Sequence, residues 1–589
     1  MSTYGPYGYL MATMDLGSLV RGRIIASLSL AVGVGLAAAV YVWSVPGLDA
    51  ARRVAMLLAL IGVFTILDPE YQWLVLFLLL FLAGLLARGR VGLVAYGLSG
   101  LVAGFCALIR LSLGVGAIAT LAAGCLLAPR PLLGAYRLGV AAPAAGAGFL
   151  IGWTASGGNL PGIGAYLTTS REISDGYSAA MSVARKTWAI DVTAFLLWFA
   201  LIIVWVVVRP GVRSRLALAG LSVPLFLAWK HSIVRQDDFH VGILVRFGVF
   251  VVAILATEAL AAWRWRGALP VAGLVLLPLA VPWFIGGPLE ISTLLRLQGV
   301  RHLFRLVDLP AYRESIEHRS RRALERLVLP ESMRRMIGHA SVDVYPWESS
   351  YVAANHLAWV NRPLPASFSA YTPTLDGSDA AFFESGKRPE YLLWHWGRQE
   401  GLRSIDTRHL FWDEPRTLRA ILGRYDVAAA GPGVLLLRAR AQPRFGAPEL
   451  LGTGSAPWTA WVPVPDVPGV LLFAASVERP AALRLLRFFF RESAMVVGVR
   501  FSSGETGGYR VAPDNTNGGL WLNPFAANWE DLPALLQDGS GRRVVAVQFR
   551  SVSPVVNWMR PSVTLSWYRL PPRTPARDEA PARGDRSGG

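Results

Sequence analysis

The chain changes character near residue 286. Apolar segments fill residues 24–286, whereas the rest of the chain is rich in charged and aromatic residues and in the turn formers Gly, Pro, Asn and Ser. A helix needs roughly 20 apolar residues to cross a bilayer. Lipid satisfies no backbone hydrogen bond, so such segments fold as helices. The first half therefore predicts a membrane-embedded helical bundle, and the second half predicts a water-soluble region.

The composition argues against a purely soluble enzyme. Hydrophobic residues make up 53% of the 589 residues, and the mean hydropathy is +0.42, which fits a half-embedded chain. Both cysteines, Cys106 and Cys125, lie within apolar segments. No disulfide framework is therefore expected to brace the soluble half.

About ten apolar segments are expected to cross or enter the membrane. Two of them, Val54–Leu67 and Leu216–Trp229, are shorter than a full crossing and are candidates for re-entrant segments or for extension by their neighbours. The others are Ile24–Val45, Trp73–Ala87, Val91–Ile109, Leu111–Ala128, Leu138–Ser156, Trp188–Val208, Val241–Trp263 and Ala268–Ile285.

Positively charged loops orient these segments. Arginines gather in alternate loops, at Arg52 and Arg53, Arg88 and Arg90, Arg130 and Arg137, Arg209, Arg213 and Arg215, and Arg264 and Arg266. The positive-inside rule places these loops in the cytoplasm. With about ten crossings from an external N-terminus, the chain leaves the membrane at Gly286 on the outside. We therefore expect a multi-pass protein of the inner (plasma) membrane whose C-terminal half is extracytoplasmic.

The chain carries a formal net charge of +18. A nucleic-acid-binding protein would gather its basic residues on one soluble face with aromatic residues beside them. Here many arginines are in short loops between apolar segments, where membrane topology explains them. Membrane lipid is the expected partner, and nucleic acid is not.

The soluble half divides by pattern. Residues 287–340 are basic with helical spacing and are expected to rest on lipid headgroups. Strand-like and helix-like segments alternate over residues 341–442, which predicts a small α/β domain with strands at Ser341–Tyr345 and Gly433–Leu437 and a helix at Pro415–Tyr425. The tail at residues 571–589 is rich in Pro, Arg and Gly and is expected to be disordered.

Short strand-like segments separated by turn residues fill residues 443–570, which predicts a β-sandwich. The expected strands are Trp458–Val462, Gly469–Ala475, Met495–Phe501, Val544–Phe549 and Ser562–Trp567. The expected fold class is thus a polytopic α-helical membrane bundle of about ten spans (residues 24–286, after an external loop remnant at 1–23), followed by an extracytoplasmic α/β domain and a β-sandwich.

The loop from Lys230 to His240 concentrates ionisable residues between two apolar segments. Ionisable groups at membrane depth are costly, and their default roles are function or mutual pairing. Lys230 and Arg235 are candidate ligands for a phosphate, Arg through its planar fork and Lys as a point charge. The alternative is a self-neutralising surface turn.

The same loop carries candidate catalytic groups. Asp237 or Asp238 is a candidate general base or ligand of a divalent metal, and His231 or His240 is a candidate proton carrier. The need for a metal stays open, and no metal-ligand set is assigned.

Two further acidic pairs are ambiguous. The helix-like segment Arg171–Met181 is either a lid, with Glu172 and Asp175 facing a lipid-linked substrate, or a solvated connecting helix. Asp68 and Glu70 lie at the expected outer edge of the membrane, where catalysis and simple topology explain them equally. The sequence contains no P-loop, no HExxH helix, no GxSxG elbow and no CxxC pair, so any chemistry is expected at the membrane face.

Five segments together resemble a family of bacterial multi-pass membrane proteins of unknown activity: Tyr4–Tyr9, Arg171–Met181, Lys230–His240, Asp343–Glu348 and Ser369–Asp376. The architecture is also similar to that of the C-type glycosyltransferases, which pair a bundle of about this many helices with an extracytoplasmic soluble domain. The first resemblance spans most of the chain, and the second is one of architecture.

The glycosyltransferase resemblance implies transfer of a sugar from a polyprenyl-phosphate donor to an extracytoplasmic envelope acceptor. Such enzymes place a catalytic acid in the first external loop, of which only Asp15 remains here. The chain opens without a preceding span, so we expect that an upstream helix is missing or that residues 1–23 are an ordinary external tail. The resemblance then implies Asp15 and the acids of the Lys230–His240 loop as catalytic residues.

Two other classes of function compete with the enzyme. A non-catalytic membrane-anchored protein would bind envelope polysaccharide or assist its assembly, and the charges of the Lys230–His240 loop would then only pair with one another. A transporter would need polar residues at mid-membrane depth, often in broken helices, and the expected spans are nearly free of charge.

Overall fold

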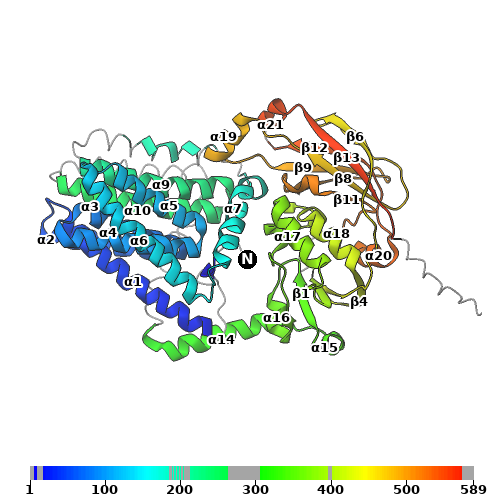
Figure 1. Cartoon of the computed structure of the whole chain (residues 1–589), viewed down its shortest axis with the longest axis horizontal. Helices are drawn as coiled ribbons and strands as arrows, with labels where there is room; N and C mark the ends of the chain where they lie inside the picture. Colours follow the sequence, from blue (N-terminus) through cyan, green and yellow to red (C-terminus); the bar gives the residue numbers. More distant parts are fainter. Residues whose placement is uncertain are drawn as a thin grey trace, which may run out of the picture. The chain divides into compact units, whose positions relative to one another are not determined.

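The computed structural model describes residues 5–8, 18–184, 212–262, 306–395, 401–552 and 554–573, with scattered residues between 189 and 203. The chain forms two compact units: the first takes in Met1–Val328 and Ala481–Ser493, and the second takes in Leu329–Pro480 and Ala494–Gly589 (Figure 1). Several predicted features lie outside the described residues, namely Asp15, most of the span Trp188–Val208, the span Ala268–Ile285, residues 287–305 and most of the tail 571–589.

The first unit is helical. Its helices begin where the sequence supplies starting signals: the Asp49 side chain accepts the Arg52 N–H at 2.8 Å, and Pro69 and Pro131 occupy first-turn positions, where the missing N–H costs nothing. The helices are α1 (Ser18–Ser44), α2 (Ala50–Ile66), α3 (Pro69–Leu86), α4 (Gly89–Ile109), α5 (Leu111–Leu126), α6 (Pro131–Ala155), α7 (Gly162–Ala180), α9 (Val212–Val234), α10 (Asp238–Ala262) and α14 (Leu309–Glu325).

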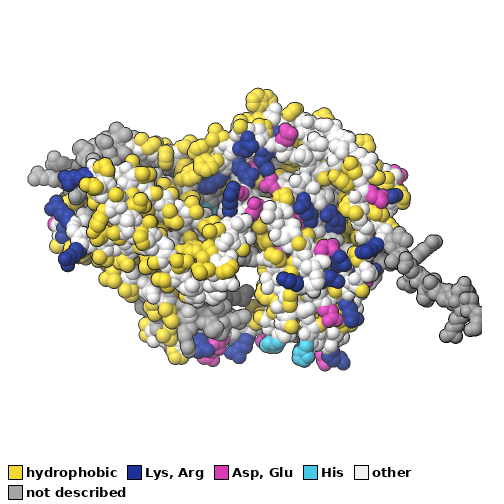
Figure 2. Space-filling model, viewed as in Figure 1, with side chains coloured by type: hydrophobic (Ala, Val, Ile, Leu, Met, Phe, Trp, Pro, Cys, Tyr) yellow, Lys and Arg dark blue, Asp and Glu magenta, His cyan; other side chains and the backbone are white. Residues whose placement is uncertain are grey.

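Among the described residues, five helices are long and apolar enough to cross a membrane. They contribute the segments Ile24–Ser44, Pro69–Leu86, Gly89–Ile109, Pro131–Ala155 and Asp238–Thr257, and α5 is a shorter apolar helix. Hydrophobic side chains are abundant on the face of this unit that Figure 2 shows, as a lipid-facing surface requires. These helices support a membrane-embedded protein. The expectation of about ten spans is not confirmed, since α2 has only 17 residues and two expected spans fall largely outside the described residues.

Small residues let α4 and α6 approach closely. A Cβ atom placed on Gly104 would lie 2.0 Å from the Ala145 carbonyl oxygen, and one placed on Gly148 would lie 2.1 Å from the Leu101 carbonyl oxygen. Without a hydrophobic effect between helices in lipid, such close backbone packing is a main source of helix association.

The second unit contains a five-stranded sheet with the strand order β2-β1-β3-β5-β4. Its strands are β1 (Ser341–Tyr345), β2 (Ala358–Trp359), β3 (Tyr391–His395), β4 (Tyr425–Gly431) and β5 (Val434–Ala439). The strands β2, β1 and β3 are parallel, and β5 runs antiparallel to β3 and β4. The predicted strand Ser341–Tyr345 is confirmed with the same bounds.

Helices pack on this sheet and bury its strands. They are α15 (Glu331–Ile337), α16 (Ser350–Asn355), α17 (Pro373–Glu384) and α18 (Pro415–Arg424). Met333 and Ile337 of α15 share a core with Val344 of β1 and Leu436 of β5. The predicted helix Pro415–Tyr425 is confirmed to within one residue. An α/β arrangement therefore forms where strands and helices were expected to alternate.

Two four-stranded antiparallel sheets follow, with the orders β10-β9-β12-β7 and β11-β8-β13-β6. The rings of Phe473 in β8 and Phe549 in β12 lie 6.2 Å apart, so side chains of the two sheets meet. The strands are β6 (Glu449–Pro457), β7 (Trp461–Pro463), β8 (Val470–Ser476), β9 (Met495–Phe501), β10 (Thr506–Val511), β11 (Leu520–Asn523), β12 (Val544–Ser551) and β13 (Ser562–Leu570). The sequence predicted β9 with these bounds but missed β6, β10 and β11. Glycines weaken the apolar alternation of β6 and β10.

One segment of the C-terminal half belongs to the first unit. Helix α19 (Ala481–Phe489) and the residues up to Ser493 connect β8 with β9 yet pack with the N-terminal helices. The sequence placed this segment within a β-sandwich at residues 443–570. The amphipathic pattern of this short segment does not indicate which part of the protein its apolar face contacts.

Candidate polar cavity in the helical unit

One end of the helical unit carries a chain of ionisable residues. Glu70 and Tyr71 lie in the first turn of α3, Arg110 is the single residue between α4 and α5, and His231 lies in the last turn of α9. The first turn of α3, the α4–α5 junction and the last turn of α9 meet at the same end of the bundle, as the contacts among these side chains show.

Arg110 connects the buried carboxylate of Glu70 to the imidazole of His231. Its Nη1 lies 3.4 Å from Glu70 Oε2 and 3.2 Å from His231 Nε2. The side chains of Glu70, His231 and Arg110 are 7%, 11% and 16% exposed, so each charge depends on its neighbours rather than on bulk water.

These contacts show which ring nitrogen of His231 carries the proton. A guanidinium has no acceptor, so the Nε2 atom of His231 must accept from Arg110 and the ring proton resides on Nδ1. His231 Nδ1 lies 3.4 Å from the Tyr71 hydroxyl and 3.9 Å from Glu70 Oε1. The imidazole is therefore neutral, and its orientation is fixed from both sides.

The turn between α9 and α10 forms a second group of contacts. Asp237 accepts from Arg235 Nε at 3.0 Å, and its other oxygen lies 2.6 Å from His240 Nδ1. Burial raises the pKa of the Asp237 carboxyl, but the hydrogen bonds from His240 and the charge of Arg235 outweigh burial and hold the pKa below its ordinary value. The His240 ring lies 4.8 Å from the His231 ring, which joins this group to the Arg110 contacts.

Lys230 has a defined partner. Its ammonium donates to the backbone oxygens of Arg487 and Phe490 at the end of α19. A cation suits this position, because the last carbonyls of a helix lack partners within the helix.

A cavity of about 190 Å³ opens beside these groups. Its polar lining comes from α3, α5, α7, α9 and the α4–α5 junction, and its apolar lining comes from α5, α7 and α9. The lining residues are Gly5, Tyr71, Arg110, Leu111, Ser112, Leu113, Ser170, Ile173, Ser174, Tyr177, Ser178, Leu227, Lys230, His231 and Val234. The N-terminal segment reaches this end as well, since the Gly5 N–H donates to the Ile109 oxygen at 2.9 Å.

The structure brings together part of the predicted site. Lys230 lines the cavity, and Arg235, Asp237 and His240 pair with one another in the adjacent turn. Asp238 is exposed at the first position of α10. The other predicted acid, Asp15, lies outside the described residues.

Sequence reasoning missed Tyr71, Tyr177 and Arg110 as lining residues and left Glu70 ambiguous. A usable signal existed for Arg110, because a lone charge between two apolar helices is expensive at membrane depth. Asp175 instead forms an exposed ion pair with Arg171 on α7, whereas Ile173, Tyr177 and other residues of this helix line the cavity.

A further ion pair braces the same end of the bundle. Arg246 of α10 donates from Nε and Nη2 to Asp68 Oδ2 at 3.1 and 2.7 Å. This partner explains how an arginine is accommodated inside an otherwise apolar helix. Asp68, the second ambiguous acid, thus has a structural partner outside the cavity lining.

No metal centre is found within the described ranges. Among those residues, no group of three or more His, Cys, Asp or Glu side chains is arranged to hold a metal ion.

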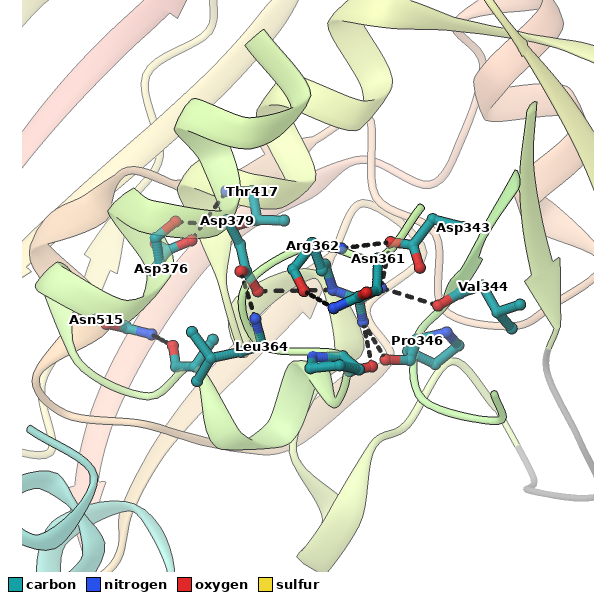
Figure 3. A network of polar contacts seen from close by, with 12 residues as sticks. Asp343, Val344, Pro346, Asn361, Arg362, Leu364, Asp376, Asp379, Thr417 and Asn515 are labelled. Carbon is teal, nitrogen blue, oxygen red and sulfur yellow. Dashed lines mark hydrogen bonds and ion pairs between the residues drawn. The ribbon is translucent and has the colours of Figure 1, made fainter. Parts of the chain in front are cut away.

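A separate ionic network lies within the second unit (Figure 3). The fully buried Arg362 donates from Nη1 to Asp343 Oδ2 at 3.0 Å and to the Val344 oxygen at 2.8 Å, and from Nη2 to the Pro346 oxygen at 2.5 Å. Its Nε lies 3.6 Å from Asp379 Oδ2. Burial raises the pKa of the Asp379 carboxyl to about 7, although the Arg362 charge opposes this shift.

The neighbouring Asp376 joins two helices of that unit. Its oxygens on α17 accept the N–H groups of Arg416 and Thr417 at the start of α18, at 3.0 and 2.9 Å. A carboxylate in this position satisfies N–H groups that a helix leaves without partners. The network is therefore a scaffold of the α/β region.

Comparisons with protein-family models, with curated proteins and with solved structures found no match to this chain.

Proposed function

We propose that the protein is a membrane glycosyltransferase that moves a sugar from a polyprenyl-phosphate donor to an extracytoplasmic envelope acceptor. The observation that carries this proposal is the 190 Å³ cavity at the polar end of the helical unit. It combines apolar walls with two cations and a neutral imidazole, which are the features that a lipid-linked phosphate ester and a proton transfer require.

The cavity residues suit the two chemical parts of such a donor. Leu111, Leu113 and Leu227 offer apolar surface to the first prenyl units, whereas Arg110 and Lys230 offer positive charge to the phosphate. An ammonium has three N–H donors, and two of those of Lys230 donate to backbone oxygens of the α19 segment. Its third donor and the Arg110 fork are assigned to the phosphate oxygens.

The transfer reaction balances without a further reactant. An oxygen of the acceptor hydroxyl attacks the anomeric carbon of the sugar, and a new glycosidic C–O bond forms. The bond between the anomeric carbon and the phosphate oxygen breaks, and the polyprenyl phosphate leaves with its electron pair. The hydroxyl proton passes to a base, and the cations stabilise the charge that develops on the leaving phosphate.

His231 is the proposed base. It lines the cavity, and its neutral form has a nitrogen lone pair that can take a proton once the phosphate competes for Arg110. Asp237, the acid favoured by the sequence, has a lowered pKa and two side-chain partners, so it is a weak base. We assign Asp237 to positioning His240, whose ring packs edge-on against His231.

The test is transfer of labelled sugar from polyprenyl-phosphate sugars to envelope acceptors in membranes that contain the full chain. We expect His231→Gln to lower the transfer rate by about 10²-fold or more, as loss of a general base does. Arg110→Lys, which keeps a charge but loses the fork, should lower it as well. Arg171→Gln is the matched control, since Arg171 is exposed and pairs with Asp175 outside the cavity lining.

Transfer that is unaffected by His231→Gln and Arg110→Lys in folded protein would overturn the assignment of the site. No transfer by the wild-type chain, combined with retention of polysaccharide, would replace the enzyme with a membrane-anchored binding protein.

A further inference from the structure

Helix α19 exposes an unusual amount of apolar surface for its length. Four large side chains on this helix of nine residues are exposed, with Leu485 at 62%, Leu486 at 41%, Phe488 at 61% and Phe489 at 55%. A contiguous group of large exposed apolar side chains usually marks a surface that a membrane or another molecule covers.

Helix α19 lies against the C-terminal part of α9. The rings of Phe488 and Phe489 lie 5.9 and 6.3 Å from the ring of Phe226 in α9. The Trp229 indole N–H donates to the Phe489 oxygen at 3.3 Å, and the Lys230 ammonium donates to the Phe490 oxygen. The apolar surface of α19 is therefore continuous with that of α9.

The residues that follow α19 form hydrogen bonds that hold it at one end of the helical unit. Arg491 Nη1 donates to the Val183 oxygen at 3.0 Å and to Gln236 Oε1 at 2.5 Å. The Glu492 N–H donates to Ser178 Oγ at 3.3 Å. Val183 and Gln236 lie in the segments that follow α7 and precede α10, and Ser178 lies in the last turn of α7 and lines the cavity, so α19 lies at the same polar end of the helical unit as the cavity.

The charges of the segment complement a lipid headgroup layer. Residues 481–493 contain three arginines and one glutamate. Arg484 is exposed on the helix, whereas Arg487 and Glu492 lie 3.8 Å apart. Amphipathic helices with arginines beside Leu and Phe lie in the membrane interface, with the apolar face in the acyl region and the cations at the phosphates.

We propose that α19 is a bilayer-interface anchor contributed by the C-terminal half of the chain. Leu485, Leu486, Phe488 and Phe489 contact lipid acyl chains, and Arg484 contacts headgroup phosphates. The occupant of this surface is the lipid bilayer, because the exposed face continues the apolar surface of α9 and because the net positive charge fits anionic headgroups. The anchor stands independently of the enzymatic proposal.

The test measures where the α19 side chains lie in reconstituted protein. Spin labels are attached to single cysteines at Phe488→Cys and Leu485→Cys in the full chain, in a Cys106→Ala/Cys125→Ala background. The protein is reconstituted in vesicles of phosphatidylcholine with phosphatidylglycerol. Collision rates with oxygen, which concentrates in the acyl region, are compared with those of a water-soluble nickel chelate.

Two control labels provide a lipid-exposed reference and a water-exposed reference. Leu36→Cys marks the apolar helix α1, where Leu36 is 64% exposed, and Leu450→Cys marks strand β6 of the second unit, where Leu450 is 60% exposed. We expect labels at 485 and 488 to favour oxygen over the chelate, as the label at 36 does, with the label at 450 showing the reverse. Preference for the chelate at 485 and 488 would overturn the anchor. Protection from both reagents would overturn it as well, in favour of a protein partner. Leu486→Cys repeats the measurement should either first label disturb folding.

Discussion

At the scale of single residues, Arg110 organises the polar end of the bundle. Arg110 is the single residue that separates the apolar helices α4 and α5. Its side chain contacts Glu70 and His231, which are 40 and 121 positions away in the chain. Such a lone charge can be recognised in the sequence as costly. Its partners cannot, because no local pattern connects positions so far apart.

Arg110→Ala should lower the free energy of unfolding by about 3 kcal/mol or more, since removing one partner of a buried pair leaves the other charge uncompensated. Glu70→Gln combined with Arg110→Gln should recover most of this loss, because neither side chain is then charged. Thermal unfolding in detergent measures both variants. Strictly additive effects of the two single Gln variants would contradict a coupled pair.

The Asp379 carboxyl gives the second unit a pH dependence. Its pKa is about 7 in the folded protein against an ordinary value of 3.8. Between these values the folded state holds a proton that the unfolded chain releases, so this group stabilises the fold at low pH and the contribution is lost as the pH rises to 7. Asp379→Asn should therefore become progressively more stable relative to wild type from pH 5 to pH 8.

Amide hydrogen exchange of β1 and β3, corrected for intrinsic rates, measures this difference in the full chain. Burial lowers the pKa values of His395 and His409 to about 4, so these residues make the fold more stable as the pH rises. Both proteins contain them, so their effect cancels in the comparison. A difference between the two proteins that stays constant with pH would contradict the assignment.

At the scale of elements, the packing of α4 on α6 depends on glycine. Gly104→Ala should destabilise the protein by about 1–3 kcal/mol, as overpacking does, because the new Cβ would collide with the Ala145 oxygen. Gly146→Ala on α6 is the matched control, since a Cβ there meets nothing within 4 Å. Melting temperatures in detergent compare the two. Equal melting temperatures would show that α4 and α6 have more room than the structure indicates.

Elements differed in how far the sequence predicted them. Strand β1 was predicted because its short segment is rich in Val and Tyr, and helix α18 was predicted because acidic residues and Pro415 mark its start. Strand β10 was missed because Gly507 and Gly508 interrupt its alternation. Helix α19 was missed because an amphipathic segment of nine residues has the same pattern on a soluble domain as on a membrane surface.

At the scale of the whole molecule, the change in hydropathy near residue 286 predicted a helical first part and a sheet-containing second part. It did not predict that residues 481–493 return to the helical unit. The Lys230–His240 loop was also predicted to be chemically important. Its residues lie beside the cavity, but Asp237, Arg235 and His240 pair among themselves, and the remaining lining comes from helices that only the tertiary fold brings together.

The central claim is that the polar cavity holds a lipid-linked phosphate. Native mass spectrometry of the full chain in detergent, titrated with polyprenyl phosphate, tests this claim most directly. The variant Ser174→Trp fills the cavity from α7 without removing Arg110 or Lys230, and Gly146→Ala controls for substitution within the bundle. We predict one bound polyprenyl phosphate per wild-type chain and per Gly146→Ala chain, with binding weakened at least tenfold by Ser174→Trp. Equal binding to all three proteins, or none to the wild type, would contradict the account.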